Sequence, residues 1–199
     1  MEDNKPWALT SEPGEGHQIS VDPNTTNHKP QSLVGVEVTG STMGIIGMGH
    51  IGCRIAQKGK GFDMKVLYHN RTRRSVEEEQ AVGATYCEKM DDLLKDTREL
   101  NLMKPTATLV NISRGRVVDQ DALVKALKSE TILAAALDVT YPEPLPRDHP
   151  LLGLPNVLIT PHVGTDTLST SRKMVQRMVE NAVAVRKGQT IPNEVKPKM

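Results

Sequence analysis

Short apolar runs alternate with amphipathic segments along most of the chain, as expected when strands are followed by helices. Ile45 and Ile46 lie in an apolar run that predicts a strand, and Ile51, Ile55 and Ala56 then recur at helical spacing. By the same criteria, strands are predicted over residues 65–69, 84–87, 107–111, 132–139 and 157–160, and helices over residues 76–82, 90–94 and 99–103.

Two longer helices complete the pattern. Asp119 can cap a helix N-terminus, and the helix predicted after it carries Leu123, Ala126 and Leu127. The last helix ends at Gly188, and its apolar face is formed by Met174, Val175, Met178, Val179, Ala182 and Val183. Strands that alternate with helices form a parallel sheet with helices on both faces. The sequence therefore predicts an α/β fold built on a doubly wound, Rossmann-like parallel sheet.

The turn between the first strand and the first helix is rich in glycine and has the pattern GxGxxG. Glycines at these positions allow a tight turn, a close approach of the backbone to a pyrophosphate, and close packing of helix on strand. The helix N-terminus adds free N–H groups and a positive dipole. Because glycines also cluster in ordinary loops, the motif gains weight only from the strand before it and the helix after it. We predict that the turn binds a dinucleotide through Gly47, Met48, Gly49, His50, Ile51 and Gly52.

The two ends of the chain differ from this central part. Residues 1–32 are polar, rich in Pro, Gly, Asn and Thr, and without sustained periodicity, so we expect a loosely ordered arm. Residues 33–188 are expected to form an NAD(P)-binding, Rossmann-like domain, and residues 189–199 a C-terminal tail.

Composition narrows the function classes. A formal net charge of +1 gives no reason to expect nucleic acid or an anionic membrane as a partner. No apolar run approaches the ~20 residues that span a membrane, and the N-terminus lacks the pattern of a signal peptide. Two cysteines are too few for a disulfide framework and lie in no metal-ligand spacing, so we predict no metal site. These features favour a cytoplasmic protein and leave a homodimer open.

The end of the second predicted strand indicates which dinucleotide fits. An NAD site has an Asp or Glu about 20 residues after the glycines, where it accepts a hydrogen bond from the ribose. This chain instead has a basic stretch there, formed by Asn70, Arg71, Thr72, Arg73 and Arg74. Such a stretch is often only a solvated turn, but after a glycine motif it suits a 2′-phosphate. We therefore expect NADPH to be preferred, with NAD as the alternative cofactor.

Three further motifs follow strand ends, where ligands bind in sheets of this kind. Arg114 follows one strand, Glu143 lies in a proline-rich loop after the next, and His162 follows a third. Each residue taken singly is more often an ordinary surface residue. Together, a carboxylate beside an imidazole favours its protonated form and fixes its tautomer, and an Arg stabilises a developing charge. This combination predicts reduction of a small 2-oxo acid.

These motifs resemble those of the D-2-hydroxyacid dehydrogenase family, and most closely its glyoxylate/hydroxypyruvate reductases. The similarity runs from about residue 34 to residue 195, over residues 47–52, 111–115, 135–145 and 161–164 in order. It implies that Arg114 binds the substrate, that Glu143 supports the histidine, and that His162 is the acid/base. It also implies a cofactor site that includes Ser113, Arg114, Asp138, His162 and Gly164.

The chain departs from the family pattern in two places. Family members have a strand and a cofactor-contacting loop between the helix after Cys87 and the helix before Asn111, whereas here residues 93–100 connect the two helices directly. Roughly twenty residues are absent, more than the ~5–6 of a mean strand. The polar arm also does not replace the family's N-terminal substrate domain. We therefore expect a shortened form of a reductase; the alternative is an inactive protein that keeps only a dinucleotide-binding or regulatory role.

Overall fold

The computed structural model describes residues 36–93, 100 and 103–195, and the strands within these ranges pair only in parallel. They form two three-stranded sheets, one with the order β1-β2-β3 and the other with the order β4-β5-β6. The strands are β1 (Thr42–Ile46), β2 (Lys65–His69), β3 (Ala84–Tyr86), β4 (Thr108–Asn111), β5 (Ala134–Leu137) and β6 (Val157–Ile159). The predicted α/β fold with parallel pairing is confirmed.

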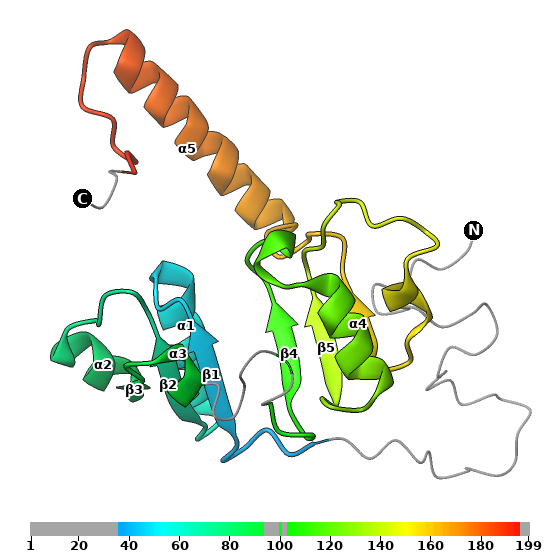
Figure 1. Cartoon of the computed structure of the whole chain (residues 1–199). Coiled ribbons are helices and arrows are strands. Elements are labelled where there is room, and N and C mark those ends of the chain that lie inside the picture. Colours follow the sequence, from blue (N-terminus) through cyan, green and yellow to red (C-terminus); the bar gives the residue numbers. More distant parts are fainter. Residues whose placement is uncertain (1–35, 94–99, 101–102, 196–199) are drawn as a thin grey trace, which may run out of the picture.

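The helices connect these strands in the predicted alternation (Figure 1). They are α1 (His50–Gly61), α2 (Val76–Val82), α3 (Met90–Leu93), α4 (Gln120–Lys128) and α5 (Leu168–Arg186), with 3-10 turns at Gly115–Val117 and Pro150–Gly153. The bounds predicted for β2 and α2 are confirmed to the residue. The predicted arm over residues 1–32 and most of the predicted helical turn over residues 99–103 lie outside the described residues. No helix in the described ranges is long and apolar enough to cross a membrane.

The strand predicted over residues 132–139 is shorter than expected. Only Ala134–Leu137 forms the β5 ladder, because its neighbours β4 and β6 are four and three residues long. The flanking Ile132 and Val139 are still buried, at 0% and 2% exposure. The apolar run over residues 132–139 therefore predicts which residues are buried at its ends. The length of strand β5 is set by the neighbouring strands with which it pairs.

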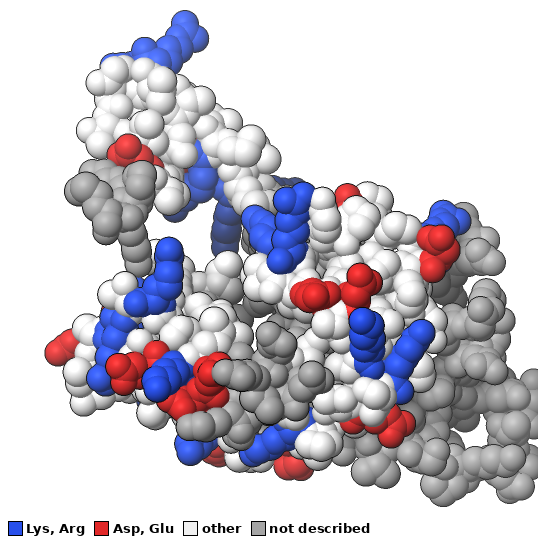
Figure 2. All heavy atoms as spheres, in the orientation of Figure 1, with Lys and Arg blue, Asp and Glu red and all other residues white. Residues whose placement is uncertain are grey.

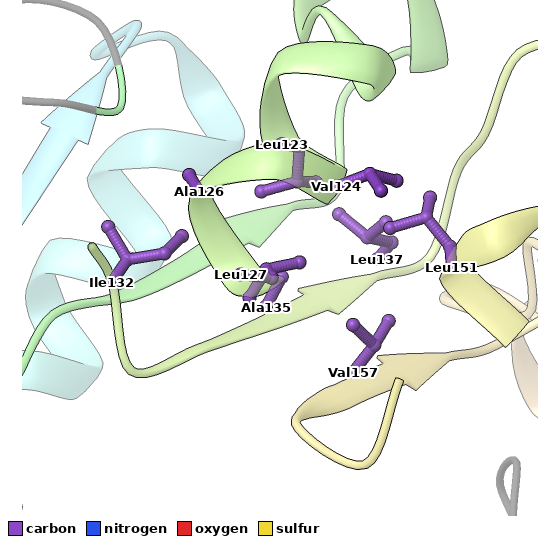
Figure 3. Close-up of a cluster of buried hydrophobic side chains, with 9 residues drawn as sticks. All are labelled: Leu123, Val124, Ala126, Leu127, Ile132, Ala135, Leu137, Leu151 and Val157. Carbon is purple, nitrogen blue, oxygen red and sulfur yellow. The ribbon is translucent and has the colours of Figure 1, made fainter. Parts of the chain in front are cut away.

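Each sheet has its own hydrophobic core. In the first, α1 packs on β1 and β2 through Ile45, Ala56, Val66 and Tyr68. In the second, α4 packs on β4 and β5, and Figure 3 shows the side chains that converge between them. This second cluster contains Leu123, Val124, Ala126, Leu127, Ile132, Ala135, Leu137, Leu151 and Val157.

The two sheets are separate where a doubly wound sheet would be continuous. β1 pairs with β2 on one side only, and β4 pairs with β5 on one side only, so within the described residues each has an unpaired edge. In Figure 1, β1 and β4 are the strands of the two sheets drawn nearest to each other. A single central strand between them would give the order 3-2-1-x-4-5-6, which reverses direction at β1 as in a Rossmann sheet.

Helix α5 extends away from the body of the molecule (Figure 1). Thr167 caps its N-terminus by accepting a hydrogen bond from the amide of Thr170, and Gly188 follows its end with φ +64°. Its predicted apolar face is present but exposed: Met178 is 65% exposed and Val179 is 55% exposed. In the space-filling view much of the visible surface of this helix carries no charge (Figure 2). The amphipathic pattern therefore predicts the helix correctly. The apolar face that it predicts is not buried, since Ala184 is the only buried residue of α5 within the described residues.

Candidate functional site

The glycine turn has the geometry of a dinucleotide site. Gly47 has φ +99°, which L side chains rarely adopt, and its amide donates to the carbonyl of His69 on β2 at 3.0 Å. A Cβ on Gly52 would lie 2.3 Å from the carbonyl oxygen of Gly47, so the helix can approach the turn only without a side chain there. A Cβ on Gly49 would meet nothing within 4 Å, which leaves open space beside the backbone at this position. These three environments match the three roles predicted for the glycines.

The N-terminus of α1 is open to an anion. Its N-cap residue, Gly49, has no side chain to accept from the first amides, and no acidic residue lies in the first turn. The first N–H groups of a helix have no partner inside the helix. Of the other turn residues, Met48 is 2% exposed and belongs to the first core, whereas His50 and Ile51 are exposed. The turn can therefore hold a pyrophosphate through backbone amides, and these residues fit the predicted cofactor.

The basic stretch after β2 lies in a turn in which the three arginines have different environments. Arg71 is exposed and makes no hydrogen bond or ion pair with a residue that the structure describes. Arg73 instead binds Glu79 on α2 with two hydrogen bonds of 2.8 Å. Arg74 binds Glu78, also on α2, at 2.5 Å. The side-chain amide of Asn70 donates from Nδ2 to the backbone carbonyl of Thr72 and shapes the turn. The sequence did not reveal these acidic partners, because α2 follows the turn and its facing side depends on the fold.

The loop after β4 is shaped by the buried amide of Asn111. Its Oδ1 accepts from the amide and the hydroxyl of Ser113, and its Nδ2 donates to the carbonyl of Arg114 at 3.0 Å. Arg114 itself is exposed, and it donates one hydrogen bond to the carbonyl of Ser113. A Cβ on Gly115 would lie 2.0 Å from the carbonyl oxygen of Thr140, so this loop packs directly on the loop after β5. Arg114 is thus presented at the strand end, and within the part of the chain that the structure describes its guanidinium makes this one hydrogen bond.

Asp138, the first residue after β5, holds the loop that follows β6. Its carboxylate accepts from the hydroxyl of Thr160, from the amide of Val163 at 2.9 Å and from the amide of Gly164 at 3.1 Å. Burial alone would raise the pKa of this carboxyl, but the three hydrogen bonds and the nearby His162 outweigh it and lower the pKa. A Cβ on Gly164 would come within 3.1 Å of the same carboxylate. Asp138 was predicted to contact the cofactor; its visible role is to fix this loop.

The loop held by Asp138 carries His162, which pairs with Glu143. His162 Nδ1 lies 2.8 Å from Glu143 Oε1, and the two side chains are 50% and 40% exposed. His162 has φ +55°, an uncommon conformation for a residue other than glycine, and its amide donates to the carbonyl of Thr160. The predicted histidine–carboxylate pair is therefore present between two loops, and it is formed by Nδ1 of a half-exposed imidazole.

Residues that the sequence analysis did not single out hold the Glu143 loop. Gln120 binds Tyr141 twice, donating to its carbonyl at 2.6 Å and accepting from its amide at 2.8 Å. The guanidinium of Arg116 lies over the Tyr141 ring, 4.1 Å from its centre, and donates to its hydroxyl. Gln120 stands next to the predicted cap residue Asp119, and no local pattern distinguishes its amide from that of a surface glutamine. These contacts attach the Glu143 loop to the 3-10 turn Gly115–Val117 and to the first residue of α4.

Arg114, Glu143 and His162 follow β4, β5 and β6, which are neighbours in one parallel sheet, so their strand ends lie along one edge. Of these three side chains, Glu143 and His162 are the two for which the described structure gives a direct contact. The glycine turn follows β1, which belongs to the other sheet. Among the described residues no group of three His, Cys, Asp or Glu side chains could hold a metal ion.

Comparison with known proteins agrees with this geometry. The chain is 42% identical over 189 residues to a glyoxylate reductase of Aeropyrum pernix, covering 85% of this chain and 56% of the relative. It is also 42% identical over 185 residues to glyoxylate/hydroxypyruvate reductase B of Pectobacterium atrosepticum, covering 83% of this chain and 57% of that protein. The crystal structure of a D-lactate dehydrogenase with NAD+ from Lactobacillus jensenii superposes with a TM-score of 0.74 at 29% identity, over 85% of this chain and 60% of that one.

The same comparisons agree with the internal deletion that the sequence predicts. The Aeropyrum alignment runs over 189 residues but includes 85% of this chain's 199 residues, or about 169, so about 20 positions of the relative have no counterpart here. A family model matches in two pieces, residues 15–98 and 94–164, which meet where the deletion was predicted. The first piece begins inside the predicted polar arm. The chain spans a little over half the length of the curated relatives it matches.

That model describes the NAD binding domain of D-isomer specific 2-hydroxyacid dehydrogenases, and its two matches together cover well over half of the chain. The glycine turn, the strand-end arginine and the histidine–glutamate pair all lie within the matched residues. The chain therefore belongs to the D-isomer specific 2-hydroxyacid dehydrogenase family, through the NAD binding domain of that family.

Proposed function

We propose that this chain carries the cofactor-binding and proton-transfer parts of a reductase that converts a small 2-oxo acid, of the glyoxylate or hydroxypyruvate type, into the D-2-hydroxy acid. The observation that carries this proposal is the 2.8 Å pair between His162 Nδ1 and Glu143 Oε1 at the end of a parallel sheet. Two of the relatives reported above are named as reductases of these acids.

The chain's own residues supply positioning and a proton. When bound, the nicotinamide supplies the hydride. Glu143 accepts from Nδ1 of His162 and stabilises the imidazolium, whose Nε2–H donates a proton to the carbonyl oxygen of the substrate and leaves the neutral Nδ1–H tautomer. The exposed guanidinium of Arg114 binds the substrate carboxylate by charge-assisted hydrogen bonds. The amides at the N-terminus of α1 bind the pyrophosphate.

For the cofactor, we propose that NADPH is preferred over NADH. The turn after β2 offers a guanidinium from Arg71 and has no carboxylate within residues 70–74, and Glu78 and Glu79 on α2 are both paired with arginines. A 2′-phosphate is attracted to such a turn, whereas the ribose 2′-hydroxyl of NADH finds no acceptor of the usual kind there.

The alternative is a protein that binds the dinucleotide without turning over a substrate. The unpaired edges of β1 and β4 favour it, because the deletion lies at the switch point where ligands of such sheets bind. Under this alternative the glycine turn keeps its function, while Arg114 and His162 are no longer aligned with the nicotinamide.

One experiment separates the two functions. Purified chain is titrated calorimetrically with NADPH and NADH, and then assayed with glyoxylate or hydroxypyruvate beside the Aeropyrum reductase. We expect NADPH to bind and a measurable oxidation of NADPH that depends on the 2-oxo acid. Binding without any acid-dependent oxidation would support the alternative, and absence of binding to either dinucleotide would contradict both.

A further inference from the structure

A buried carboxylate lies behind the turn that is proposed to select the cofactor. Glu79 of α2 has a side chain only 9% exposed, and it accepts two hydrogen bonds of 2.8 Å from Arg73 and one of 2.6 Å from the hydroxyl of Tyr68. Tyr68, on β2, is fully buried, and its hydroxyl also accepts from the amide of Arg74 at 3.0 Å. The Glu79 cluster, formed by Tyr68, Arg73 and Glu79, thus connects strand, turn and helix.

The cluster fixes the turn close to Arg71. On one side of Arg71, the carbonyl of Asn70 accepts from the hydroxyl of Tyr86 on β3. On the other side, Arg73 is held by Glu79 and also lies over the Tyr86 ring, with 5.5 Å between the guanidinium carbon and the ring centre. The segment between these two attachments carries an exposed Arg71 without a described partner.

Arg73 itself is committed to the cluster. Moving its guanidinium, which is 56% exposed, to a phosphate would leave the largely buried Glu79 carboxylate without its cation, and a buried carboxylate without a partner is unfavourable. The bidentate fork geometry also makes this pair stronger than a single ion contact. The hydrogen bond from Arg73, and to a smaller extent that from Tyr68, lowers the pKa of Glu79 to about 2. Burial, and to a smaller extent the hydrogen bond to Glu79, raises the pKa of Tyr68 to about 12. The cluster therefore keeps one ionisation state across the range of ordinary assays.

We propose that Glu79 is a positioning residue for cofactor selection: through Arg73 and Tyr68 it fixes the turn so that Arg71 alone meets the 2′-phosphate. This inference rests on the proposed preference for NADPH. It assigns the selecting contact to one arginine of the three and gives Arg73 a supporting role, although both were predicted from the sequence to bind the cofactor.

The test is calorimetric titration of the whole chain with NADPH and with NADH. Arg71→Ala is expected to weaken NADPH binding by about 10- to 100-fold and leave NADH binding unchanged, as for loss of a charged hydrogen bond. Glu79→Gln and Arg73→Ala are each expected to reduce the NADPH-to-NADH affinity ratio by several-fold. The double variant, Glu79→Gln with Arg73→Ala, should have the same NADPH-to-NADH affinity ratio as either single variant, because both substitutions act through the same ion pair. Glu180→Gln, which breaks the exposed pair with Arg177 on α5, is the matched control and should not change the ratio.

The outcomes distinguish the possible roles. A higher NADPH preference in Glu79→Gln would mean that Arg73, once released, binds the phosphate, and would overturn the inference. Equal weakening of both cofactors would reduce Glu79 to a general structural role and would also overturn it. If Glu79→Gln does not fold, Tyr68→Phe keeps the ion pair and removes one hydrogen bond, and an unchanged ratio in it would count against the inference. A wild-type chain that binds both cofactors equally would refute the NADPH preference itself, before any variant is compared.

Discussion

At the scale of single residues, the proposed chemistry depends on His162 and the two groups that orient it. Asp138 fixes the loop through the amides of Val163 and Gly164, and Glu143 binds Nδ1 at 2.8 Å. General acid catalysis contributes about 10²–10⁴-fold to a rate. We therefore expect His162→Ala, in a catalytically competent form of this protein, to reduce kcat with a 2-oxo acid by about that factor. Steady-state kinetics at saturating NADPH measure the loss.

Glu143→Gln is the matched variant for this prediction. An amide of the same shape can still accept from Nδ1, but it does not stabilise the imidazolium electrostatically, so the loss should be smaller than for His162→Ala. Calorimetric binding of NADPH should be the same in Glu143→Gln and the wild type. Turnover that is unaffected by His162→Ala would remove the histidine from the mechanism.

The glycine turn gives a second prediction for single residues. Gly52→Ala would place a methyl group 2.3 Å from the carbonyl oxygen of Gly47, whereas Gly49→Ala would meet no protein atom within 4 Å. We expect Gly52→Ala to lower the unfolding temperature, since backbone must move to accept the methyl group. Gly49→Ala should leave the unfolding temperature unchanged and weaken dinucleotide binding, because its open space is where the pyrophosphate approaches. Thermal unfolding and titration of both variants check this; a Gly49→Ala chain that binds NADPH normally would contradict the assignment.

At the scale of elements, the Glu79 cluster connects β2 to α2 and makes their packing depend on pH. The pKa of Glu79 is lowered from an ordinary value of 4.5 to about 2 by its bonds to Arg73 and Tyr68. A lowered pKa in the folded state means that the stabilisation is complete above pH 4.5 and is lost as the pH falls through about 2. The unfolding temperature should therefore decline below pH 4.5, and Glu79→Gln should remove part of that decline.

The same cluster responds to alkaline pH with the opposite sign. The pKa of Tyr68 is raised from 10.0 to about 12, so its contribution to stability is complete below pH 10 and is lost as the pH rises through about 12.

Asp138 also has a lowered pKa and adds to the acid decline, which is why the comparison needs the Glu79→Gln variant. Identical acid profiles for the variant and the wild type would show that the cluster does not stabilise the fold.

Elements were predictable from the sequence where local pattern decides, and less so where a distant neighbour decides. Ser75 and Glu78 form a complete capping box, and the bounds of α2 agree with the prediction. The glycine pattern likewise identified the turn and its three environments. The length of β5 depends on β4 and β6, and the pairing of Arg73 depends on which face of α2 meets the turn. Those facts belong to tertiary structure, and no run of residues encodes them locally.

At the scale of the whole molecule, the deletion divides one doubly wound sheet into two. About 20 positions of the Aeropyrum relative have no counterpart in this chain, the two family-model matches overlap at residues 94–98, and the described strands β1 and β4 do not pair with each other. A central parallel strand is normally paired on both edges and buried on both faces. The described residues contain no strand that pairs with both β1 and β4, and Ile46 on β1 and Val110 on β4 are 56% and 62% exposed. The two cores are intact, but the sheet that should join them is interrupted.

This interruption leads to the prediction for the whole chain. The glycine turn belongs to one sheet, whereas Arg114, Glu143 and His162 belong to the other. Their relative placement determines whether the substrate meets the nicotinamide, and an error of 1 Å can cost on the order of 10²-fold in rate. We expect this chain to reduce glyoxylate far more slowly than the Aeropyrum reductase and to unfold at a lower temperature.

The decisive comparison restores the missing strand within the chain. The roughly 20 residues that the Aeropyrum relative has at this point are inserted between Leu93 and Leu100, and a Gly/Ser segment of equal length is the control. The native segment should raise the unfolding temperature because it pairs both open edges, whereas the flexible segment should not. Glyoxylate turnover should rise only with the native segment. Activity of the unmodified chain within a few-fold of the Aeropyrum enzyme would show that the two sheets already hold the site in register without the strand.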